Sequence, residues 1–404
     1  MLILSGIASW VGCSDPVEFE MMADPTVPQT PLFAVTGAVV EAGGVLSPWL
    51  LLFSSIEADL EFDLDQALSP GPGVFFAPGD GSVLWLQQDA PIVQRFQPTA
   101  DGGFESYGQL SFGSFGITNA SQHLIVSISP TKAYLIDRLR PQFIVWNPQT
   151  LEIEGRTMLM GLKRPDLVTN IEFVDLIDDR VVVVARYRRD FDDSWAPLTV
   201  AAFLDPVTND VTYAEDERCG NVVSGVQASD GLVYVGSFMT SAAETFAGEG
   251  GSPAVMPCQV RLSASDQTFD DDYFVDLAAW TPSGLIGGPL AISGDALFYS
   301  VFDPASPLPP PGAPSTSLTR APVWQLHTNT PDGGAETLTP IGGLPLSGTL
   351  FSLSTFDGIE GRQTTLGLFA PNFSESTVFD ISEPEAPSEL FSTPGPIGQI
   401  VRVR

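Results

Sequence analysis

Four short apolar segments between His123 and Leu159 constrain the fold more than any other part of the sequence. They are rich in Val, Ile, Tyr, Phe and Thr and are separated by Pro, Asn and Asp, which is typical of β-strands joined by tight turns. Asn147-Pro148 provides the sharpest turn, because proline fixes φ and lacks the N–H that a strand ladder needs. One four-stranded sheet cannot bury both of its faces. We therefore expect similar units to pack against it.

Units of the same kind recur along the chain. Further groups of four predicted strands occupy residues 73–112, 170–217, 222–279, 285–341 and 349–393. The first group has three strands instead of four, predicted at Leu32–Val39, Pro48–Ser55 and Glu57–Leu64. The last strand, Ile397–Arg404, has no group of its own and fits the place missing from the first.

This recurrence predicts an all-β fold, a β-propeller with seven four-stranded blades in a single domain at residues 32–404. A period of roughly 50 to 60 residues favours a propeller over a sandwich, although six or eight blades remain alternatives. The C-terminal strand is expected to be the innermost strand of the N-terminal blade, which closes the ring and leaves no sheet edge exposed. No window of 12 or more residues has a helical apolar period.

The charge balance limits the partners. The 404 residues include 17 Lys and Arg against 49 Asp and Glu, a formal charge of −32. Binding to nucleic acid or anionic lipid draws on Lys and Arg, so this composition disfavours both. An acidic, solvated surface is the simplest interpretation.

The N-terminus is expected to lie outside the fold. Residues 2–12 form an apolar run of signal-peptide length, and Trp10-Val11-Gly12-Cys13 resembles a bacterial lipobox, with Trp10 where leucine is usual. This predicts a signal segment at residues 1–13, lipidation of Cys13 and a flexible, proline-containing tether at residues 14–31. The alternative is a free or buried cysteine in an ordinary N-terminus. Lipidation would place the protein in the cell envelope, outside the cytoplasm, with the lipid anchor as its membrane contact.

Cys219 and Cys258 are the remaining cysteines. In an oxidising compartment we predict a disulfide between them. Two reduced core thiols, or half of a metal site, are the alternatives. Neither His123 nor His327 has zinc-site spacing to these cysteines, so we predict no metal and no cofactor.

Long loops and basic residues point to one face of the propeller. Second-to-third strand loops and inter-blade connections share a face, and the loops expected at Arg189–Pro197, Met239–Pro257 and Asp303–Arg320 are long. Such loops are common sites of binding, although tolerated insertions are the alternative. Guanidinium groups beside aromatic rings hold planar anions or catecholates through paired hydrogen bonds and stacking. The candidate ligand-binding residues are Arg138, Arg140, Arg188, Arg189, Phe191, Trp195 and Arg320, with Arg186 nearby. Simple pairing of these arginines with Asp137, Asp190, Asp192 and Asp193 is the alternative.

Other chemistries leave little trace. The sequence has no nucleophile elbow, zinc-protease motif, phosphate loop or dinucleotide fingerprint, and we predict no catalytic residues. His123 and His327 fall in predicted strands and are each expected to be packed or solvated, with no catalytic role. Asp270-Asp271-Asp272 lacks the spacing of a calcium loop and is interpreted as a solvated turn.

The central part of the chain resembles a known family in several short segments. These are Ser129-Pro-Thr-Lys-Ala-Tyr-Leu-Ile136, Ile144-Val-Trp-Asn-Pro148, Leu151-Glu-Ile153, Arg218-Cys219, Asp230-Gly-Leu-Val-Tyr234, Cys258-Gln-Val-Arg-Leu262, Phe269-Asp270 and Asp272-Tyr273. They are similar to the MxcI-type propeller lipoproteins associated with myxochelin siderophore genes. The resemblance implies a propeller, a cysteine pair and a link to iron–siderophore uptake outside the cytoplasm. It implies no catalytic residues.

We therefore expect an extracytoplasmic, lipid-anchored and monomeric binding protein whose partner is a ferric siderophore or an outer-membrane receptor. A propeller lyase or hydrolase acting on polysaccharide or lactone, and a structural scaffold for protein–protein contacts, are the alternatives.

Overall fold

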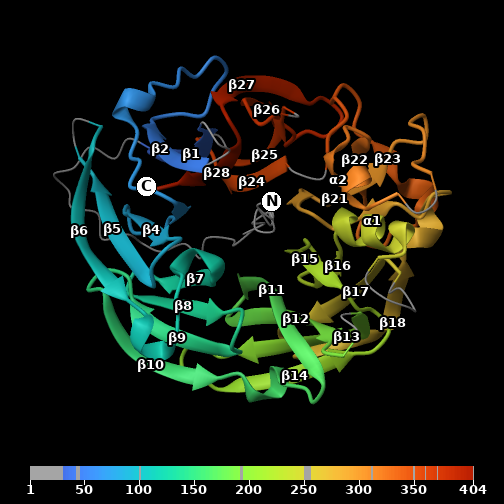
Figure 1. The fold of residues 1–404 in the computed structure, drawn as a ribbon, viewed down its shortest axis with the longest axis horizontal. Helices are drawn as coiled ribbons and strands as arrows, with labels where there is room; N and C mark the ends of the chain where they lie inside the picture. Colours follow the sequence, from blue (N-terminus) through green and yellow to red (C-terminus); the bar gives the residue numbers. More distant parts are fainter. Residues whose placement is uncertain are drawn as a thin grey trace.

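The computed structural model is a ring of antiparallel sheets around a central axis (Figure 1). It describes residues 31–41, 46–99, 102–191, 194–249, 256–310, 313–348, 351–359, 361–370 and 372–403. Within these residues the sheets number seven, which confirms the predicted seven-bladed β-propeller. The predicted signal segment with Cys13, and the predicted tether up to residue 30, lie outside the described residues.

The blades are numbered I to VII along the chain, and the strands of each are given from the axis outward. Blade I contains β28 (Ile397–Arg402), β1 (Phe33–Val40) and β2 (Leu46–Phe53). Blade II contains β3 (Gly73–Phe76), β4 (Val83–Gln87), β5 (Ile92–Pro98) and β6 (Phe104–Ser111). Blade III contains β7 (Leu124–Ser129), β8 (Lys132–Asp137), β9 (Gln142–Asn147) and β10 (Glu152–Met158). Blade IV contains β11 (Leu167–Ile177), β12 (Arg180–Arg189), β13 (Trp195–Leu204) and β14 (Val211–Asp216).

The second half of the ring repeats the order. Blade V contains β15 (Val222–Gln227), β16 (Val233–Ser237), β17 (Cys258–Ser263) and β18 (Thr268–Asp276). Blade VI contains β19 (Ile286–Gly287) and β20 (Ile292–Ser293), which share the inner position, then β21 (Ala296–Phe302), β22 (Trp324–Asn329) and β23 (Thr339–Pro340). Blade VII contains β24 (Phe351–Asp357), β25 (Arg362–Phe369), β26 (Glu375–Asp380) and β27 (Ser388–Pro394).

Short helices occupy some connections. The α-helices are α1 (Met239–Ala247) and α2 (Thr316–Arg320). The 3-10 helices are η1 (Leu64–Gln66), η2 (Gly113–Phe115), η3 (Ala120–Gln122), η4 (Met160–Leu162), η5 (Leu277–Trp280) and η6 (Ala335–Thr337).

The ring closes as predicted, through the C-terminal strand. β28 pairs antiparallel with β1, with Ile400 opposite Val35 and Arg402 opposite Phe33. The N–H of Val403 donates to the carbonyl of Leu32 at 2.7 Å, which extends the pairing beyond the strand. This pairing ties the two ends of the folded ring together and covers the inner edge of β1.

The outer part of blade I differs from the prediction. Glu57–Leu64 forms no strand, because Asp59 takes a left-handed φ of 66° that interrupts the extended run. Leu60, Phe62 and Leu64 nevertheless pack on the blade I–VII core. Only Leu68 occupies the fourth-strand position, through a single bridge with two 3.0 Å hydrogen bonds to Leu50.

Three further boundaries differ from the sequence prediction. The strand expected at residues 335–341 begins as the 3-10 helix η6, and only β23 (Thr339–Pro340) is strand within it. β18 begins at Thr268, before the predicted Phe274, and contains Asp270–Asp272, which was interpreted as a turn. The blade IV loop spans only residues 190–194, because β12 and β13 extend further than expected. The two longer loops, in blades V and VI, carry α1 and α2.

The hydrophobic core lies between the blades. Seven apolar clusters fill the spaces between neighbouring blades, such as Val126 and Tyr134 of blade III packed with Ile171 and Val183 of blade IV. Both faces of the middle strands are therefore covered, which explains why residues 181–185 of β12 are apolar without alternation. This packing fixes each blade against its neighbours.

Candidate functional site

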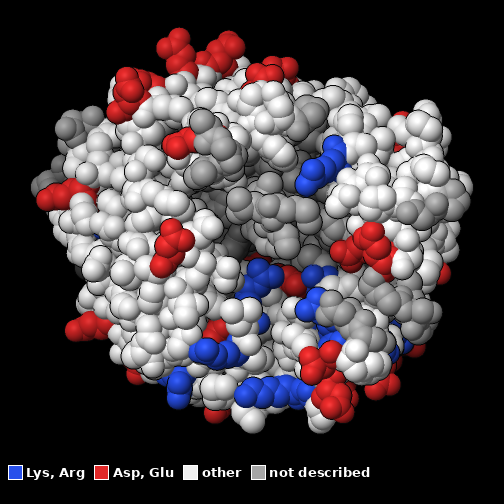
Figure 2. Space-filling model, viewed as in Figure 1, with Lys and Arg blue, Asp and Glu red and all other residues white. Residues whose placement is uncertain are grey.

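Basic side chains gather over blades III and IV on the face that carries the second-to-third strand loops (Figure 2). Arg138 follows β8 in the blade III loop, and Arg186 and Arg188 lie near the end of β12. Trp195 begins β13, opposite Arg188. With two carboxylates, Glu172 of β11 and Glu244 of α1, these four residues form what we call the mouth cluster.

Glu172 joins two blades. It lies in a β-bulge of β11, the innermost strand of blade IV, where the register with β12 shifts between Ile171 and Phe173. One oxygen pairs with Arg138 of blade III. The other accepts from Nε and Nη2 of Arg186 at 3.0 and 2.8 Å. Two guanidinium groups thus share one buried carboxylate.

Backbone contacts hold Arg138 in place. Its Nε donates to the carbonyl of Ile171 at 2.8 Å, and its own backbone N–H donates to Nδ1 of His123 at 3.2 Å. Among the residues that the structure describes, no group accepts a hydrogen bond from Arg138 Nη1. The side chain therefore keeps the two N–H groups of Nη1 for solvent or a ligand.

Trp195 stacks against the cluster. The Arg186 guanidinium lies 3.9 Å from the ring centroid and that of Arg188 lies 6.0 Å from it, both within cation–π range. The Trp195 side chain also hydrogen-bonds to Glu244, so α1 is attached to the cluster. Arg186 Nη1 donates to Oδ1 of Asn221, at the start of blade V. The cluster thereby connects blades III, IV and V.

Burial shifts the pKa of two groups in the cluster in opposite senses. Burial lowers the pKa of Arg186, although the charge and hydrogen bonds of Glu172 counteract this effect. Burial raises the pKa of Glu244, while Arg186 and the Trp195 hydrogen bond counteract it. Both shifts show that the cluster lies in a partly desolvated place, where charge interactions are stronger than in water.

The predicted ligand residues separate into two groups. Arg138, Arg188 and Trp195 meet in the mouth cluster with Arg186. The other four, Arg140, Arg189, Phe191 and Arg320, lie elsewhere on the face. Arg140 donates to the carbonyl of Gly116 at 2.6 Å, and Arg189 folds back onto Ser194 and the Trp195 carbonyl. Phe191 is 78% exposed, and Arg320 ends α2 in blade VI.

The carboxylates of the cluster are not the aspartates that the sequence suggested. Asp137 accepts the backbone N–H groups of Leu139 and Arg140 at 3.0 Å each and so shapes the blade III loop. Asp190 contributes a backbone hydrogen bond to Asp166, while Asp192 and Asp193 lie outside the described residues. Sequence reasoning missed Glu172 and Glu244. An acidic residue within an apolar innermost strand was the available signal for Glu172.

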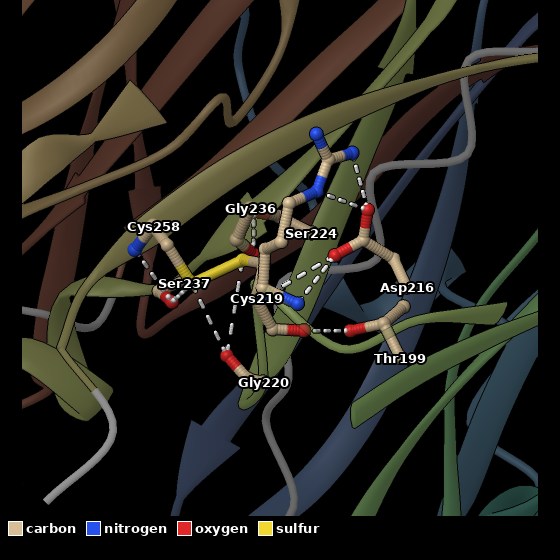
Figure 3. Close-up of a disulfide and its surroundings, with 9 residues drawn as sticks. Thr199, Asp216, Cys219, Gly220, Ser224, Gly236, Ser237 and Cys258 are labelled. Carbon is tan, nitrogen blue, oxygen red and sulfur yellow. Dashed lines mark hydrogen bonds and ion pairs between the residues drawn. A yellow bond between two sulfur atoms is a disulfide. The ribbon is translucent and has the colours of Figure 1, made fainter. Parts of the chain in front are cut away.

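The predicted disulfide forms between Cys219 and Cys258 (Figure 3). It joins the connection that precedes β15 to the first residue of β17, directly after the loop that carries α1. The Cys219 carbonyl accepts from Thr199 Oγ1 at 2.6 Å, and the Cys258 N–H donates to Ser237 Oγ at 3.2 Å. Asn221 follows two residues after Cys219, so the disulfide braces the segment that contacts Arg186.

A cavity between blades VI and VII is too small for an organic ligand. This cavity is lined by residues such as Ser300, Leu326 and Phe351 and has a volume of about 10 Å³, enough for one water molecule. His123 and His327 are both buried, which is one of the two environments expected for them. Within the described part of the chain, no group of three or more His, Cys, Asp or Glu residues could hold a metal ion. Nor does any helix there have the length and apolarity needed to cross a membrane.

The fold and the cluster together define a seven-bladed β-propeller with arginines, carboxylates and a tryptophan at one mouth of the ring. Solved structures support this assignment of the fold. A putative 6-phosphogluconolactonase from Bacteroides fragilis matches with a TM-score of 0.55 and 12% identity, covering 94% of this chain and 100% of that one. A Lactobacillus plantarum protein matches with a TM-score of 0.55 and 11% identity, covering 93% and 100%. The periplasmic gluconolactonase PpgL from Pseudomonas aeruginosa matches with a TM-score of 0.53 and 13% identity, covering 92% and 99%.

At these identities the similarity concerns the fold alone. No family model matches the sequence, and no curated protein matches it.

Proposed function

We propose that this chain is an extracytoplasmic binding protein, attached to a membrane through lipid on Cys13, that takes a small organic anion at the mouth cluster. The observation that carries the proposal is the composition of that cluster. Three guanidinium groups, two carboxylates and one indole ring are linked in one cluster, in a protein whose formal charge is −32. The mouth cluster has an excess of positive charge, and on such an acidic chain this excess attracts an anion to one specific place.

The geometry supports a planar, multiply charged ligand. Glu172 and Trp195 hold the planes of Arg138 and Arg186 in fixed orientations, so little side-chain entropy is lost when a ligand binds. Guanidinium groups bind carboxylate or catecholate oxygens in pairs, and the indole ring offers a stacking surface. Ferric catecholate siderophores have these features, and the resemblance to siderophore-associated propellers favours them. The proposed role is assistance in iron–siderophore uptake.

A titration with ferric 2,3-dihydroxybenzoate, followed by calorimetry, tests this proposal. We expect saturable binding that weakens about tenfold or more in Arg138→Ala and in Arg188→Ala, because a hydrogen bond to a charged group contributes about 1.5–3 kcal/mol. Arg180→Ala is the matched control, since Arg180 lies at the other end of β12, where it pairs with Asp205.

Two comparison ligands sharpen the result. Metal-free 2,3-dihydroxybenzoate reports the contribution of iron, and ferric citrate reports the contribution of the catechol ring. Absence of saturable binding, or equal loss in the Arg180→Ala control, would contradict the proposal.

A second candidate function is lactone hydrolysis. Glu244 is a partly buried carboxyl group with a raised pKa beside Arg186, which is the type of group that activates water. Two solved structures with the same fold carry gluconolactonase titles. Titration of the acid released from δ-gluconolactone at constant pH tests this candidate. A rate above spontaneous hydrolysis that is lost in Glu244→Gln would favour it, and an unchanged rate would remove it.

A further inference from the structure

His123 connects the interior of blade III to the mouth cluster. It follows η3 and immediately precedes β7, and its side chain is 2% exposed. Its Nδ1 accepts the backbone N–H of Arg138 at 3.2 Å. Because a backbone N–H can only donate, Nδ1 carries no proton in this arrangement. A neutral imidazole therefore holds the backbone of one arginine of the mouth cluster.

The same ring nitrogen also faces a carboxylate. Asp137 Oδ1 lies 3.4 Å from Nδ1 of His123, and the side chain of Asp137 is equally buried. That oxygen accepts the backbone N–H groups of Leu139 and Arg140 in the loop that follows β8. A proton on Nδ1 changes the nitrogen from an acceptor into a donor. The protonated ring can pair with Asp137, but it can no longer accept from Arg138.

The contact with His123 fixes the point from which the Arg138 side chain extends. From there the side chain crosses to blade IV, where Nε donates to the carbonyl of Ile171 at 2.8 Å and Nη2 pairs with Glu172. Both partners belong to β11, so they stay in place when the blade III loop changes. Loss of the His123 contact therefore frees the start of the loop and removes the fixed orientation of the guanidinium group.

The charges around His123 determine when it gains a proton. They are Asp137 at the end of β8, and Arg138 and Arg140 in the loop that follows. Burial is the largest influence and lowers the pKa of His123 below its ordinary value of 6.5. The charge of Asp137 counteracts this effect, and the two arginines add to it. The imidazole is therefore neutral at pH 7 and gains its proton only in more acidic solution.

We propose that His123 is a pH-sensitive positioning residue for Arg138. The neutral imidazole holds Arg138 in the binding arrangement, and the protonated imidazole turns to Asp137 and releases it. Such a protein takes its anion near neutral pH and gives it up in a more acidic place. This inference rests on the proposed function of the mouth cluster, and it adds the condition under which the ligand is released.

Charge attraction alone predicts the opposite response. A proton on His123 or on Glu244 adds positive charge near the mouth cluster, and added positive charge strengthens the binding of an anion. Release in acid therefore requires that the loss of Arg138 outweighs this gain. The sign of the pH dependence separates the two accounts.

Hydrogen exchange of residues 138–141, followed by mass spectrometry from about pH 4 to 7.5, tests the positioning without any ligand. After correction for intrinsic exchange rates, protection of this loop should fall about fivefold or more in acid, because a hydrogen bond is lost. His123→Asn places an oxygen acceptor near the position of Nδ1 that takes up no proton, so its protection should not depend on pH. His123→Leu removes the acceptor and should leave the loop poorly protected at every pH.

Calorimetry with ferric 2,3-dihydroxybenzoate over the same pH range tests the consequence for binding. The measured quantity is the ratio of the Kd of the parent chain to the Kd of His123→Asn. The effects of pH on the ligand and on Glu244 are common to both proteins, so they cancel in this ratio. We expect the ratio to rise about tenfold or more as pH falls, because the parent chain alone loses the position of Arg138.

His327→Asn is the matched control. His327 is the only other histidine of the chain, is also buried, and lies in β22 of blade VI. This variant should keep the pH dependence of the parent chain, and thermal unfolding verifies that each variant is folded.

Loop protection that does not change with pH in the parent chain would overturn the inference. So would a Kd ratio that stays constant or falls in acid. If none of the proteins binds the ferric complex while loop protection still follows His123, the proposed function fails and the positioning of Arg138 by His123 stands.

Discussion

Two blade junctions of this propeller combine arginine, carboxylate and an aromatic ring, and they do so in opposite ways. In the mouth cluster, between blades III, IV and V, Arg138 and Arg186 share Glu172. On the opposite face, between blades V and VI, Arg261 alone pairs with Asp270 at 2.7 Å and Asp332 at 2.9 Å, over the ring of Tyr273. We call this second group the V–VI latch.

The pKa shifts follow this difference. Burial lowers the pKa of Arg186, and the carboxylates of Glu172 and Glu244 do not restore it. Burial also acts to lower the pKa of Arg261, but hydrogen bonds with Asp270 and Tyr234 outweigh it and the pKa is raised. An arginine with two carboxylates is satisfied within the protein and holds blades together. The mouth cluster has three arginines and two carboxylates, and on the proposed function this excess of guanidinium groups attracts a further anion.

The largest expected effect comes from removing the shared carboxylate. Glu172→Gln leaves the largely buried Arg186 and the half-buried Arg138 without their common counter-charge, and breaking a buried pair in this way costs about 3–5 kcal/mol. Asp332→Asn removes a partner that is 83% exposed, so the loss should be about 1 kcal/mol or less. Urea unfolding midpoints measure both. Equal losses in the two variants would show that the junctions do not differ as described.

The disulfide provides the next test, since it braces the mouth cluster and not the latch. It joins residues 39 positions apart, and removing a bridge of this kind costs about 2–4 kcal/mol. Cys219→Ser with Cys258→Ser should therefore lower the unfolding midpoint and also weaken anion binding through Asn221. Asp332→Asn probes the V–VI latch. The stability lost through this substitution should be the same in the parent chain and in the disulfide-free variant. A disulfide-free variant with undiminished anion binding would contradict the proposed bracing.

A smaller effect concerns pH. The stability contributed by Glu244 of the mouth cluster and by Asp270 of the V–VI latch should change with pH in opposite directions. The pKa of Glu244 is raised above its ordinary value of 4.5, so its stabilising contribution is present below pH 4.5 and is lost as pH rises through the folded-state value. The pKa of Asp270 is lowered below 3.8, mainly by its hydrogen bond from Arg261, so its contribution is present above pH 3.8 and is lost as pH falls.

Unfolding free energies measured from pH 3 to 7 test this contrast. Relative to Glu244→Gln, the parent chain should lose stability as pH rises. Relative to Asp270→Asn, it should lose stability as pH falls. Slopes of the same sign would refute the electrostatic difference between the junctions.

The sequence predicts the ring well because strand patterns and turns are local. Asn147 illustrates this, since its side chain accepts the N–H groups of Gln149 and Thr150 in the predicted turn. The closing strand was also predictable, because Ile397–Arg404 had no other partner. The strand predicted at Glu57–Leu64 was wrong for a physical reason. Its alternating apolar residues reach the core, but the left-handed Asp59 prevents a regular ladder.

The candidate site was only partly predictable, because its members come together across blades. Arg188 and Trp195 are opposite each other in one hairpin, and their proximity follows from local sequence. Glu172 is 34 residues from Arg138 and lies in a bulge that no pattern indicated. Glu244 reaches Trp195 on a helix inserted in the next blade. Contacts of this kind depend on how neighbouring blades pack.

The most direct test of the mouth cluster as a binding site is the fluorescence change that ferric 2,3-dihydroxybenzoate causes in the parent chain and in Trp195→Phe. Trp195 is one of seven tryptophans and lies against Arg186 and Arg188. If the anion binds there, most of the saturable quenching should disappear in the variant, while calorimetry still detects binding. Quenching of the same amplitude in both proteins, or no saturable change in either, would contradict the proposed site.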